Sequence, residues 1–411
     1  MTYKSHPLLF LLLIALNCLA QAPPDSRRGE VDFHDRFNPT SFLSCCAQVY
    51  QGEIEGVGSV VLELRLSPRK AGRYSGRYFF THAGHDIPFE GPMEALAESE
   101  PLAGEKGQPQ HEGFDKPHAV WNVQKSGGCC LEGEWLDRHT GKTYPFHLQD
   151  VFLAATAKAL GFEIDWPRDR DKLPDAYRFL QIQAIAKPVG EETVAGEVAY
   201  RMWEDPRTQI QYPRLTRHPD PAVMARINFL LEEKHGRFAA EMLWAQNGEC
   251  ESATSFKPTG IAKVSYLTPA LMSMVEYGLF HFCEGEFYPY SHPVTFDLIR
   301  GEYLNWNRLF DLFVPGKDGA PRPNPAFQEW YAQLEQEDRK ASPTAQDDED
   351  DCSLLAKESW DAYFIEPGSL ALEGTPRYGR CAPQAVLPFA RLKPVLKPEG
   401  ARYLFPQKAS E

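Results

Sequence analysis

Alternation of polar and apolar residues over short segments is the feature that most limits how the first part of this chain can fold. Residues 58–66 read GSVVLELRL, and successive side chains of a strand point to opposite faces. An aromatic strand is predicted over residues 74–80, and Thr140-Gly141 is expected to turn a later hairpin. Such segments, separated by glycine and proline, are typical of antiparallel sheets. We therefore predict an antiparallel β domain over residues 45–155.

The second half of the chain mixes helical and extended patterns. Asp220 and Pro221 can begin a helix whose apolar residues fall on one face, and Gly236 is expected to end it. Residues 238–244 and 262–266 are predicted as strands, Asn324-Pro325 as a helix start, and Pro367-Gly368 as the turn of a late hairpin. The fold class is therefore α+β. We expect a linker at 156–176, an α+β domain at 177–398 and a tail at 399–411.

An ordered series of short motifs connects this domain to a known family. Tyr266 to Ser273 reads YLTPALMS, and Glu276-Tyr277 follows; Ser291 to Leu298 reads SHPVTFDL, and Gly301 and Leu309-Phe310 come after it. From about residue 195 to 396 the chain resembles the extracytoplasmic C-terminal domain of RsiV-type anti-sigma factors. The resemblance implies helices packed on an antiparallel sheet, a strand at 272–283, and a receptor that binds lysozyme without catalysis. The chain departs from the family in its residues 284–290 and in showing no sigma-binding part.

The N-terminus has the layout of a secretory signal. Lys4 precedes the apolar run LLFLLLIAL at residues 8–16, and Cys18-Leu19-Ala20 offers small residues for a signal peptidase. We expect cleavage after Ala20, a disordered or extended start at 21–44, and a periplasmic or secreted mature chain. A lipoprotein reading through Cys18 is the weaker alternative. No later run reaches the ~20 apolar residues of a transmembrane helix.

Of the nine cysteines, eight remain once the signal is removed. An even number in an exported chain indicates disulfides, although the connectivity does not follow from the sequence. The vicinal pairs at 45–46 and 129–130 could bridge the two ends of the first domain. A four-thiolate zinc site is the rival, but paired zinc ligands usually have two residues between them. The disulfide candidates are Cys45, Cys46, Cys129, Cys130, Cys250, Cys283, Cys352 and Cys381.

The formal charge of −14 limits the kinds of partner. Nucleic-acid binding requires clustered lysine and arginine against phosphate, so we do not expect a nucleic-acid partner. An acidic protein attracts a basic one over long range, which favours a basic, envelope-active enzyme as partner. The alternative is that the acidity only keeps the protein soluble.

Residues 284–292 form the candidate binding segment, which we place in a proline-stiffened loop between two strands. Aromatic side chains held in this way present a large contact area at low entropic cost, as protein-binding hot spots do. Packing of the same rings over the end of the sheet is the alternative. The candidate residues are Glu284, Glu286, Phe287, Tyr288, Tyr290 and His292.

The sequence contains none of the common catalytic or cofactor-binding motifs. There is no nucleophile elbow, P-loop, dinucleotide fingerprint or zincin motif. His82, His85 and Asp86 could ligate zinc, as could His281 and His292, but solvated turn residues and packed histidines are the commoner reading. We therefore expect no cofactor, no metal and no catalytic residues.

These observations favour a non-catalytic binding protein of the cell envelope. An inhibitor of, or immunity factor against, a peptidoglycan-cleaving or other toxic enzyme would suit the acidity, the cysteines and the receptor-like resemblance. Two alternatives remain open: an envelope glycan hydrolase with unrecognised carboxylates, and a structural component of the envelope.

Overall fold

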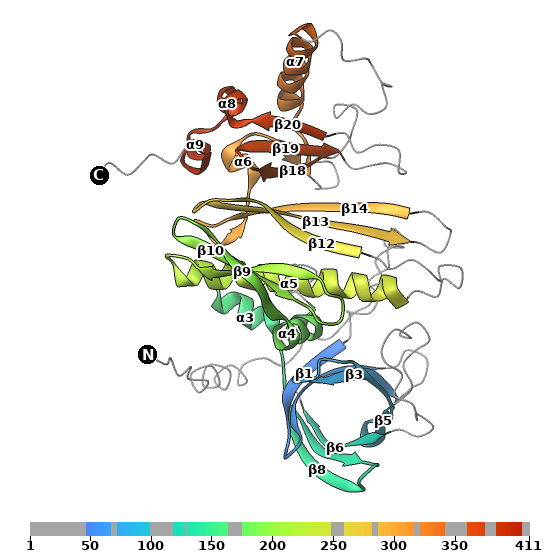
Figure 1. Ribbon diagram of the computed structural model, residues 1–411. Helices are drawn as coiled ribbons and strands as arrows, with labels where there is room; N and C mark the ends of the chain where they lie inside the picture. Colours follow the sequence, from blue (N-terminus) through green and yellow to red (C-terminus); the bar gives the residue numbers. More distant parts are fainter. Residues whose placement is uncertain are drawn as a thin grey trace. The chain divides into compact units, whose positions relative to one another are not determined.

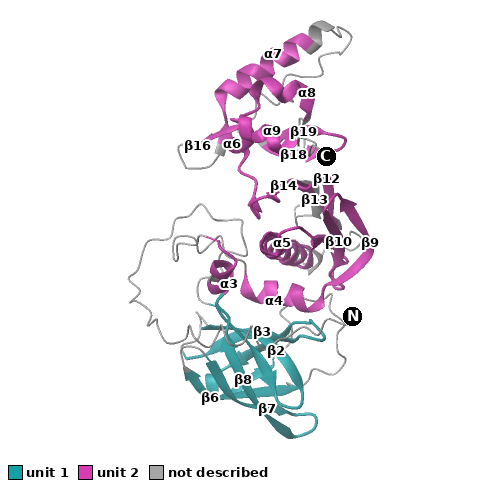
Figure 2. Cartoon of the chain, turned by 90° about the vertical axis from the view of Figure 1, so that its left-hand side faces the viewer, with its two compact units in different colours: residues 1–100, 112–152 teal, residues 101–111, 153–411 magenta. Residues whose placement is uncertain are grey.

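The chain divides into two compact units (Figure 2). Unit 1 comprises residues 1–100 and 112–152, and unit 2 comprises residues 101–111 and 153–411. The computed structural model describes residues 47–66, 72–98, 118–127, 130–162, 175–247, 259–281, 287–315, 321–341, 360–374 and 384–404.

Unit 1 is a closed antiparallel barrel in which each strand pairs with the next and β1 pairs with β8 (Figure 1). The sequence predicts an antiparallel sheet here, and the structure shows in addition that the sheet closes. A short 3₁₀ helix, Met93–Ala95, precedes β5. The strands are β1 Ala47–Ile54, β2 Gly58–Leu66, β3 Tyr74–Phe80, β4 Ile87–Gly91, β5 Leu96–Glu98, β6 Ala119–Gly127, β7 Cys130–Asp137 and β8 Lys142–Asp150.

Strand alternation fills the barrel with side chains. Leu62 pairs across β2 and β3 with Tyr78, and both belong to a core that also holds Trp121. Two strand glycines allow close approach of neighbouring backbones. A Cβ at Gly76 would lie 2.0 Å from the carbonyl oxygen of Glu63, and one at Gly133 would lie 2.1 Å from that of Asn122. These positions accept only glycine without a backbone shift.

Unit 2 is built from antiparallel sheets and helices, which confirms the predicted α+β class. The helices are α3 Leu153–Ala159, α4 Ala176–Ile185, α5 Pro221–Asn247, α6 Trp306–Leu309, α7 Pro325–Ala341, α8 Phe389–Leu392, the 3₁₀ turn Lys393–Val395 and α9 Pro398–Leu404. The strands are β9 Lys187–Ala195, β10 Val198–Glu204, β11 Gln211–Arg217, β12 Thr259–Leu267, β13 Leu271–His281, β14 Phe287–Asp297, β15 Glu302–Tyr303, β16 Phe313–Pro315, β17 Pro321–Pro323, β18 Trp360–Ile365, β19 Ser369–Gly374 and β20 Gln384–Pro388.

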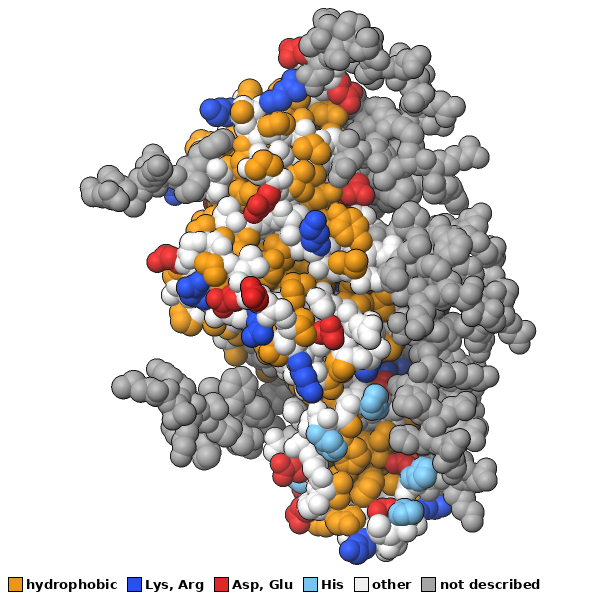
Figure 3. All heavy atoms as spheres, in the orientation of Figure 1, with side chains coloured by type: hydrophobic (Ala, Val, Ile, Leu, Met, Phe, Trp, Pro, Cys, Tyr) orange, Lys and Arg blue, Asp and Glu red, His pale blue; other side chains and the backbone are white. Residues whose placement is uncertain are grey.

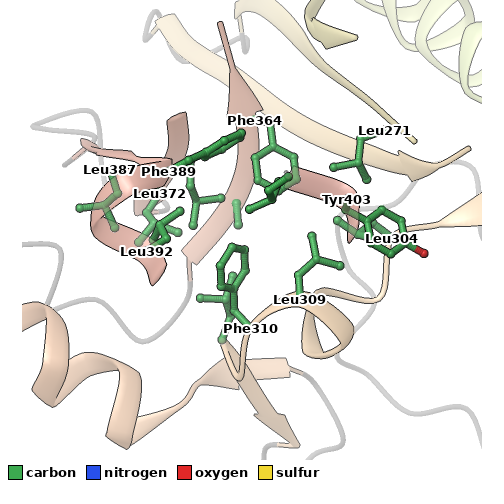
Figure 4. Packing of buried hydrophobic residues seen from close by; sticks show 14 of the residues in the cluster. Leu271, Leu304, Leu309, Phe310, Phe364, Leu372, Leu387, Phe389, Leu392 and Tyr403 are labelled. Atoms are coloured by element: carbon green, nitrogen blue, oxygen red, sulfur yellow. The ribbon is translucent and has the colours of Figure 1, made fainter. Parts of the chain in front are cut away.

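The sheet β12-β13-β14-β15 lies in the middle of unit 2, with α5 on one side and the sheet β18-β19-β20 on the other (Figure 1). Strand β13 shows why both faces are covered. Met272 and Met274 belong to the core shared with α5. Val275 packs instead with Tyr363 and Ala371 of the second sheet. A third cluster, shown in Figure 4, joins β18–β20 to α6, α8 and α9.

Helix α5 differs from its prediction. It continues through Gly236 to Asn247, so the strand predicted at residues 238–244 is wrong. Phe238 and Met242 are four residues apart and are both buried, which is the spacing of one helix face. They pack against β12 where it passes closest, because a Cβ at Gly260 would lie 2.7 Å from the ring of Phe238. Tertiary packing here outweighs the helix-ending tendency of glycine.

Helices extend into the stretches assigned as a linker, 156–176, and as a tail, 399–411. Helix α3 extends to Ala159 within the stretch assigned as a linker, and Ala157 is buried. Helix α9 extends to Leu404 in the stretch assigned as a tail. Tyr403 and Leu404 are buried there, because they complete the third core cluster. None of the helices in the described part of the chain combines the length and apolar content needed to cross a bilayer.

Candidate functional site

His292, the one candidate binding residue whose side chain is described, lies in a polar cluster between α5 and the central sheet. It is half-buried on β14 and directly opposite Glu276 of β13. Glu276 is 1% exposed and accepts a hydrogen bond from the hydroxyl of Tyr212. Its Oε1 lies 3.7 Å from Nζ of Lys234, a residue of α5. The strand pairing therefore brings His292 to an ion pair that the sequence does not reveal.

The buried ionisable groups of this cluster are stabilised by one another. Burial and the nearby Lys234 lower the pKa of His292, which is therefore neutral at pH 7. Burial lowers the pKa of Lys234, against the pull of Glu276. Burial and Glu276 raise the pKa of Tyr212, which keeps its hydroxyl proton. A buried carboxylate with a cation and a hydroxyl donor is a stable internal arrangement, and we assign this part of the cluster to the fold.

Further along α5 the cluster reaches solvent. Glu233, Arg237 and Glu241 follow one another at four-residue spacing on the helix, and Arg237 is exposed. Burial raises the pKa of both Glu233 and Glu241. Partial desolvation of the guanidinium acts to lower the pKa of Arg237, but the surrounding carboxylates outweigh it and raise that pKa. Opposite charges in succession on a helix support the helix itself, so this row also has a structural explanation.

A groove on the opposite face of the central sheet is the better candidate for a binding site. It encloses about 510 Å³, a size in the range of ligand sites. Four tyrosines contribute to its walls, together with Lys263 and Glu366, which are exposed. The lining comes from β9 and β10 (Thr193, Tyr200), β12 (residues 263–267), β13 (Val275, Tyr277), β18 (Tyr363, Ile365) and the turn after it (Glu366).

The walls of the groove differ in exposure. Tyr363 is 2% exposed and forms part of a packed base, whereas Tyr277 is 42% exposed. Ile261 lies directly opposite Tyr277 on β12 and is 63% exposed, so the apolar surface continues beyond the groove. Burial and Glu366 raise the pKa of Tyr266, which keeps its phenol neutral. Rings with polar edges beside an exposed aliphatic residue suit recognition of a protein segment.

Two carboxyl groups lie next to the base of the groove. Glu373 Oε2 accepts hydrogen bonds from the hydroxyls of Tyr363 at 3.4 Å and Ser291 at 3.3 Å. Ser291 lies directly opposite Tyr277 in the β13–β14 pairing, and Asp361 lies opposite Glu373 in the β18–β19 pairing. Burial and the negative charge of Glu373 raise the pKa of Asp361 to about 6. The carboxyl groups make this end of the groove negative.

The binding segment predicted at residues 284–292 is only partly described. Glu284 and Glu286 lie outside the described residues. Phe287, Tyr288 and Tyr290 have backbones within β14, paired with His281, Phe280 and Gly278. The predicted loop is therefore wrong from residue 287 onward, because the long β13–β14 hairpin extends the sheet that far. The strand expected at residues 272–283 is observed as β13, in which Glu276 and Tyr277 lie.

The structure describes some of the cysteine and metal-ligand candidates and not others. Cys130 begins β7 and is half-buried, and the other seven disulfide candidates lie outside the described residues. His82 and His85 are exposed after β3, and histidines lie around a hydrophobic patch on the face of unit 1 in Figure 3. Within the described ranges, no three histidine, cysteine or acidic side chains are grouped as metal ligands would be.

Sequence reasoning missed the groove because its residues come from five separate stretches of chain. One signal was present. Tyr277 continues the face of β13 that carries Val275, yet the residues directly after it, 278–280, read as an apolar run. A tyrosine at the exposed end of a buried strand is a feature of contact surfaces, but its neighbours on β10 and β18 follow only from the fold.

Solved structures of low sequence identity are similar to about half of this chain. No family model matches the sequence, and no curated protein matches it significantly. A DUF3298 family member from Bacteroides fragilis is 11% identical with a TM-score of 0.32, covering 54% of this chain and 96% of that one. A DUF3298 family protein from Pseudomonas aeruginosa is 17% identical with a TM-score of 0.26, covering 54% of this chain and 97% of that one.

Proposed function

We propose that this protein is a non-catalytic binding protein of the cell envelope that holds a segment of a partner protein in the groove of unit 2. The observation that carries the proposal is the groove itself, with about 510 Å³ between a tyrosine-rich wall and the exposed residues of β12. Tyrosines are frequent in protein-binding surfaces because they add contact area at low entropic cost. The polar cluster beside α5, in contrast, is compensated internally.

The proposal includes export and a basic partner. The signal-like residues 1–20 and the even number of cysteines after them support a periplasmic or secreted mature chain. The net charge of −14 supports a basic partner, such as an enzyme that acts on the negatively charged envelope. An inhibitor or immunity factor is the role that fits both export and a basic partner. The resemblance to the RsiV-type domain is consistent with this role.

Binding is tested with the mature chain, first by capture from an envelope extract and then by calorimetry against basic lysozymes and the captured proteins. Tyr277→Ala removes the exposed ring of the groove. Tyr303→Ala is the matched control, because Tyr303 is 41% exposed and Tyr277 is 42% exposed. We expect a partner with a Kd of about 1 μM or tighter, weakened at least about tenfold by Tyr277→Ala and little by Tyr303→Ala.

Three outcomes would contradict the proposal. One is the absence of any partner at micromolar affinity, and a second is an equal response to the two tyrosine variants. The third is release of soluble fragments from purified cell wall, which would show catalysis. Export is judged separately by mass spectrometry of the chain from cells: Gln21 as first residue supports it, and an intact Met1 with nine free thiols refutes it.

A further inference from the structure

The carboxyl pair beside the groove lacks a positively charged partner in the described structure. Asp361 and Glu373 face each other across β18 and β19. Within the described ranges, Glu373 accepts hydrogen bonds from two hydroxyls, and the charged group close to Asp361 is the carboxyl group of Glu373. Among the described residues, no lysine or arginine pairs with either carboxyl group. Every other buried or half-buried carboxylate named above has a cation or a backbone amide close by.

The pair is part of the same surface as the groove. Tyr363, which lines the base, donates its hydroxyl hydrogen to Glu373 at 3.4 Å. Ser291, which donates to the same oxygen, lies opposite Tyr277 of the groove wall. The exposed ring of Tyr277 and the two carboxyl groups are therefore connected through Ser291 and Tyr363.

We propose that this end of the groove receives a lysine or arginine side chain of the partner, with the ring of Tyr277 against its aliphatic stem or cation and the carboxyl groups of Glu373 and Asp361 at its charged end. This inference rests on the proposed function and specifies that the partner presents a cationic side chain. The ring and the carboxyl groups are each complementary to such a side chain. Tyrosine faces attract cations, and carboxylates form charge-assisted hydrogen bonds with ammonium and guanidinium groups.

Other occupants match the groove less well. An acidic side chain would add a third negative charge to a pair that already repels itself. An aliphatic side chain would leave both carboxyl groups uncompensated while removing water from them, which is unfavourable. Lys263 is the positive group at the rim, and its exposure leaves it solvated and able to move away from an incoming cation.

The test uses the full mature chain and four fluorescein-labelled nonapeptides, Gly-Ser-Gly-Ile-Xaa-Val-Gly-Ser-Gly, in which Xaa is lysine, Nε-acetyl-lysine, leucine or glutamate. Binding is followed by fluorescence anisotropy at fixed ionic strength. The protein variants are Glu373→Gln and Asp361→Asn, which keep shape and hydrogen-bonding capacity. Glu329→Gln is the control, because Glu329 is an exposed glutamate on α7 and its loss changes the net charge by the same amount.

The lysine peptide is expected to bind at least about tenfold more tightly than the acetyl-lysine, leucine and glutamate peptides. Glu373→Gln and Asp361→Asn should each remove most of that preference, and Glu329→Gln should leave it unchanged. Thermal unfolding of every variant establishes that the chain remains folded.

Equal binding of the lysine and leucine peptides, or a lysine preference that survives both carboxyl variants, would overturn the inference. If Tyr277→Ala weakens binding of the captured partner while Glu373→Gln does not, the groove binds the partner without recognising a cation. In that case only the inference fails. If neither variant affects the captured partner, the proposed function fails as well. A lysine preference lost equally in Glu329→Gln would show attraction by net charge alone and would also overturn the inference.

Discussion

Glu276 illustrates at the scale of a residue how this protein places a charge in its interior. The carboxylate is 1% exposed, and Lys234, its cationic partner, is 3% exposed. Removal of water from a charge is costly, and it is offset only by well-placed partners. The sequence shows Glu276 in a largely apolar strand, but its partners lie 42 and 64 residues earlier. The ion pair with Lys234 and the hydrogen bond from Tyr212 therefore follow only from the fold.

Lys234→Met is expected to lower the free energy of unfolding by about 3 kcal/mol, because it removes the lysine that pairs with the buried carboxylate of Glu276. Urea unfolding measures the change. The double variant Lys234→Met/Glu276→Gln should recover part of the loss, and Lys263→Met, at an exposed position, should change stability by less than about 0.5 kcal/mol. A loss in Lys234→Met no larger than in Lys263→Met would refute the structural role of the pair.

Asp361 predicts a dependence of stability on pH. Its folded pKa of about 6 lies above the ordinary value, so the folded chain binds the proton more tightly than the unfolded chain does. The contribution of protonated Asp361 to the free energy of unfolding is fully present below about pH 4 and is lost as the pH rises through 6. Asp361→Asn should therefore be more stable than the wild type by about 1–2 kcal/mol at pH 8 and equal to it at pH 4. Urea titrations at both pH values measure this, and a gain of the same size at both would contradict it.

At the scale of elements, alternation and turn residues predict the strands well. The hairpins at Thr140-Gly141 and Pro367-Gly368 occur where the sequence places them. Helix α5 shows where local reasoning fails. The sequence predicts a helix end at Gly236, a residue type that often ends helices, and a strand at residues 238–244. The buried face supplied by β12 keeps the segment helical, and a contact with a strand more than 15 residues later cannot be read from the segment itself.

The barrel strands depend on close backbone approach at particular glycines. Gly133→Ala is expected to destabilise unit 1 by about 3 kcal/mol or more, because the added Cβ would lie 2.1 Å from the carbonyl oxygen of Asn122. Gly141→Ala, at a turn with φ of 68° and open space around it, should cost only about 1 kcal/mol. Denaturant unfolding compares the two variants. A smaller loss for Gly133→Ala than for Gly141→Ala would show that the barrel backbone yields easily.

At the scale of the whole molecule, composition and pattern predict two parts and the α+β class. They do not predict that β1 closes onto β8, because that pairing joins residues about 100 positions apart. Nor do they predict the groove, which requires β10, β12, β13 and β18 to be brought together. The sequence predicts many individual strands and helices, but the pairing of elements far apart in the chain is known only from the folded structure.

The two units have separate cores, so we expect two unfolding transitions in the full mature chain. Gly133→Ala should lower only the transition of unit 1, and Lys234→Met only that of unit 2. Calorimetry of the wild type and both variants resolves this. A single transition that both variants shift to the same extent would indicate that the units unfold as one.

The most direct measurement of the central claim is hydrogen–deuterium exchange of the mature chain with and without its captured partner. The account predicts slower exchange in β12, in the part of β13 around Tyr277, and in the turn at Glu366, which border the groove. It predicts little change in the barrel strands or in α7. Protection confined to the barrel or to α7, with β12 and β13 exchanging as in the free protein, would contradict it.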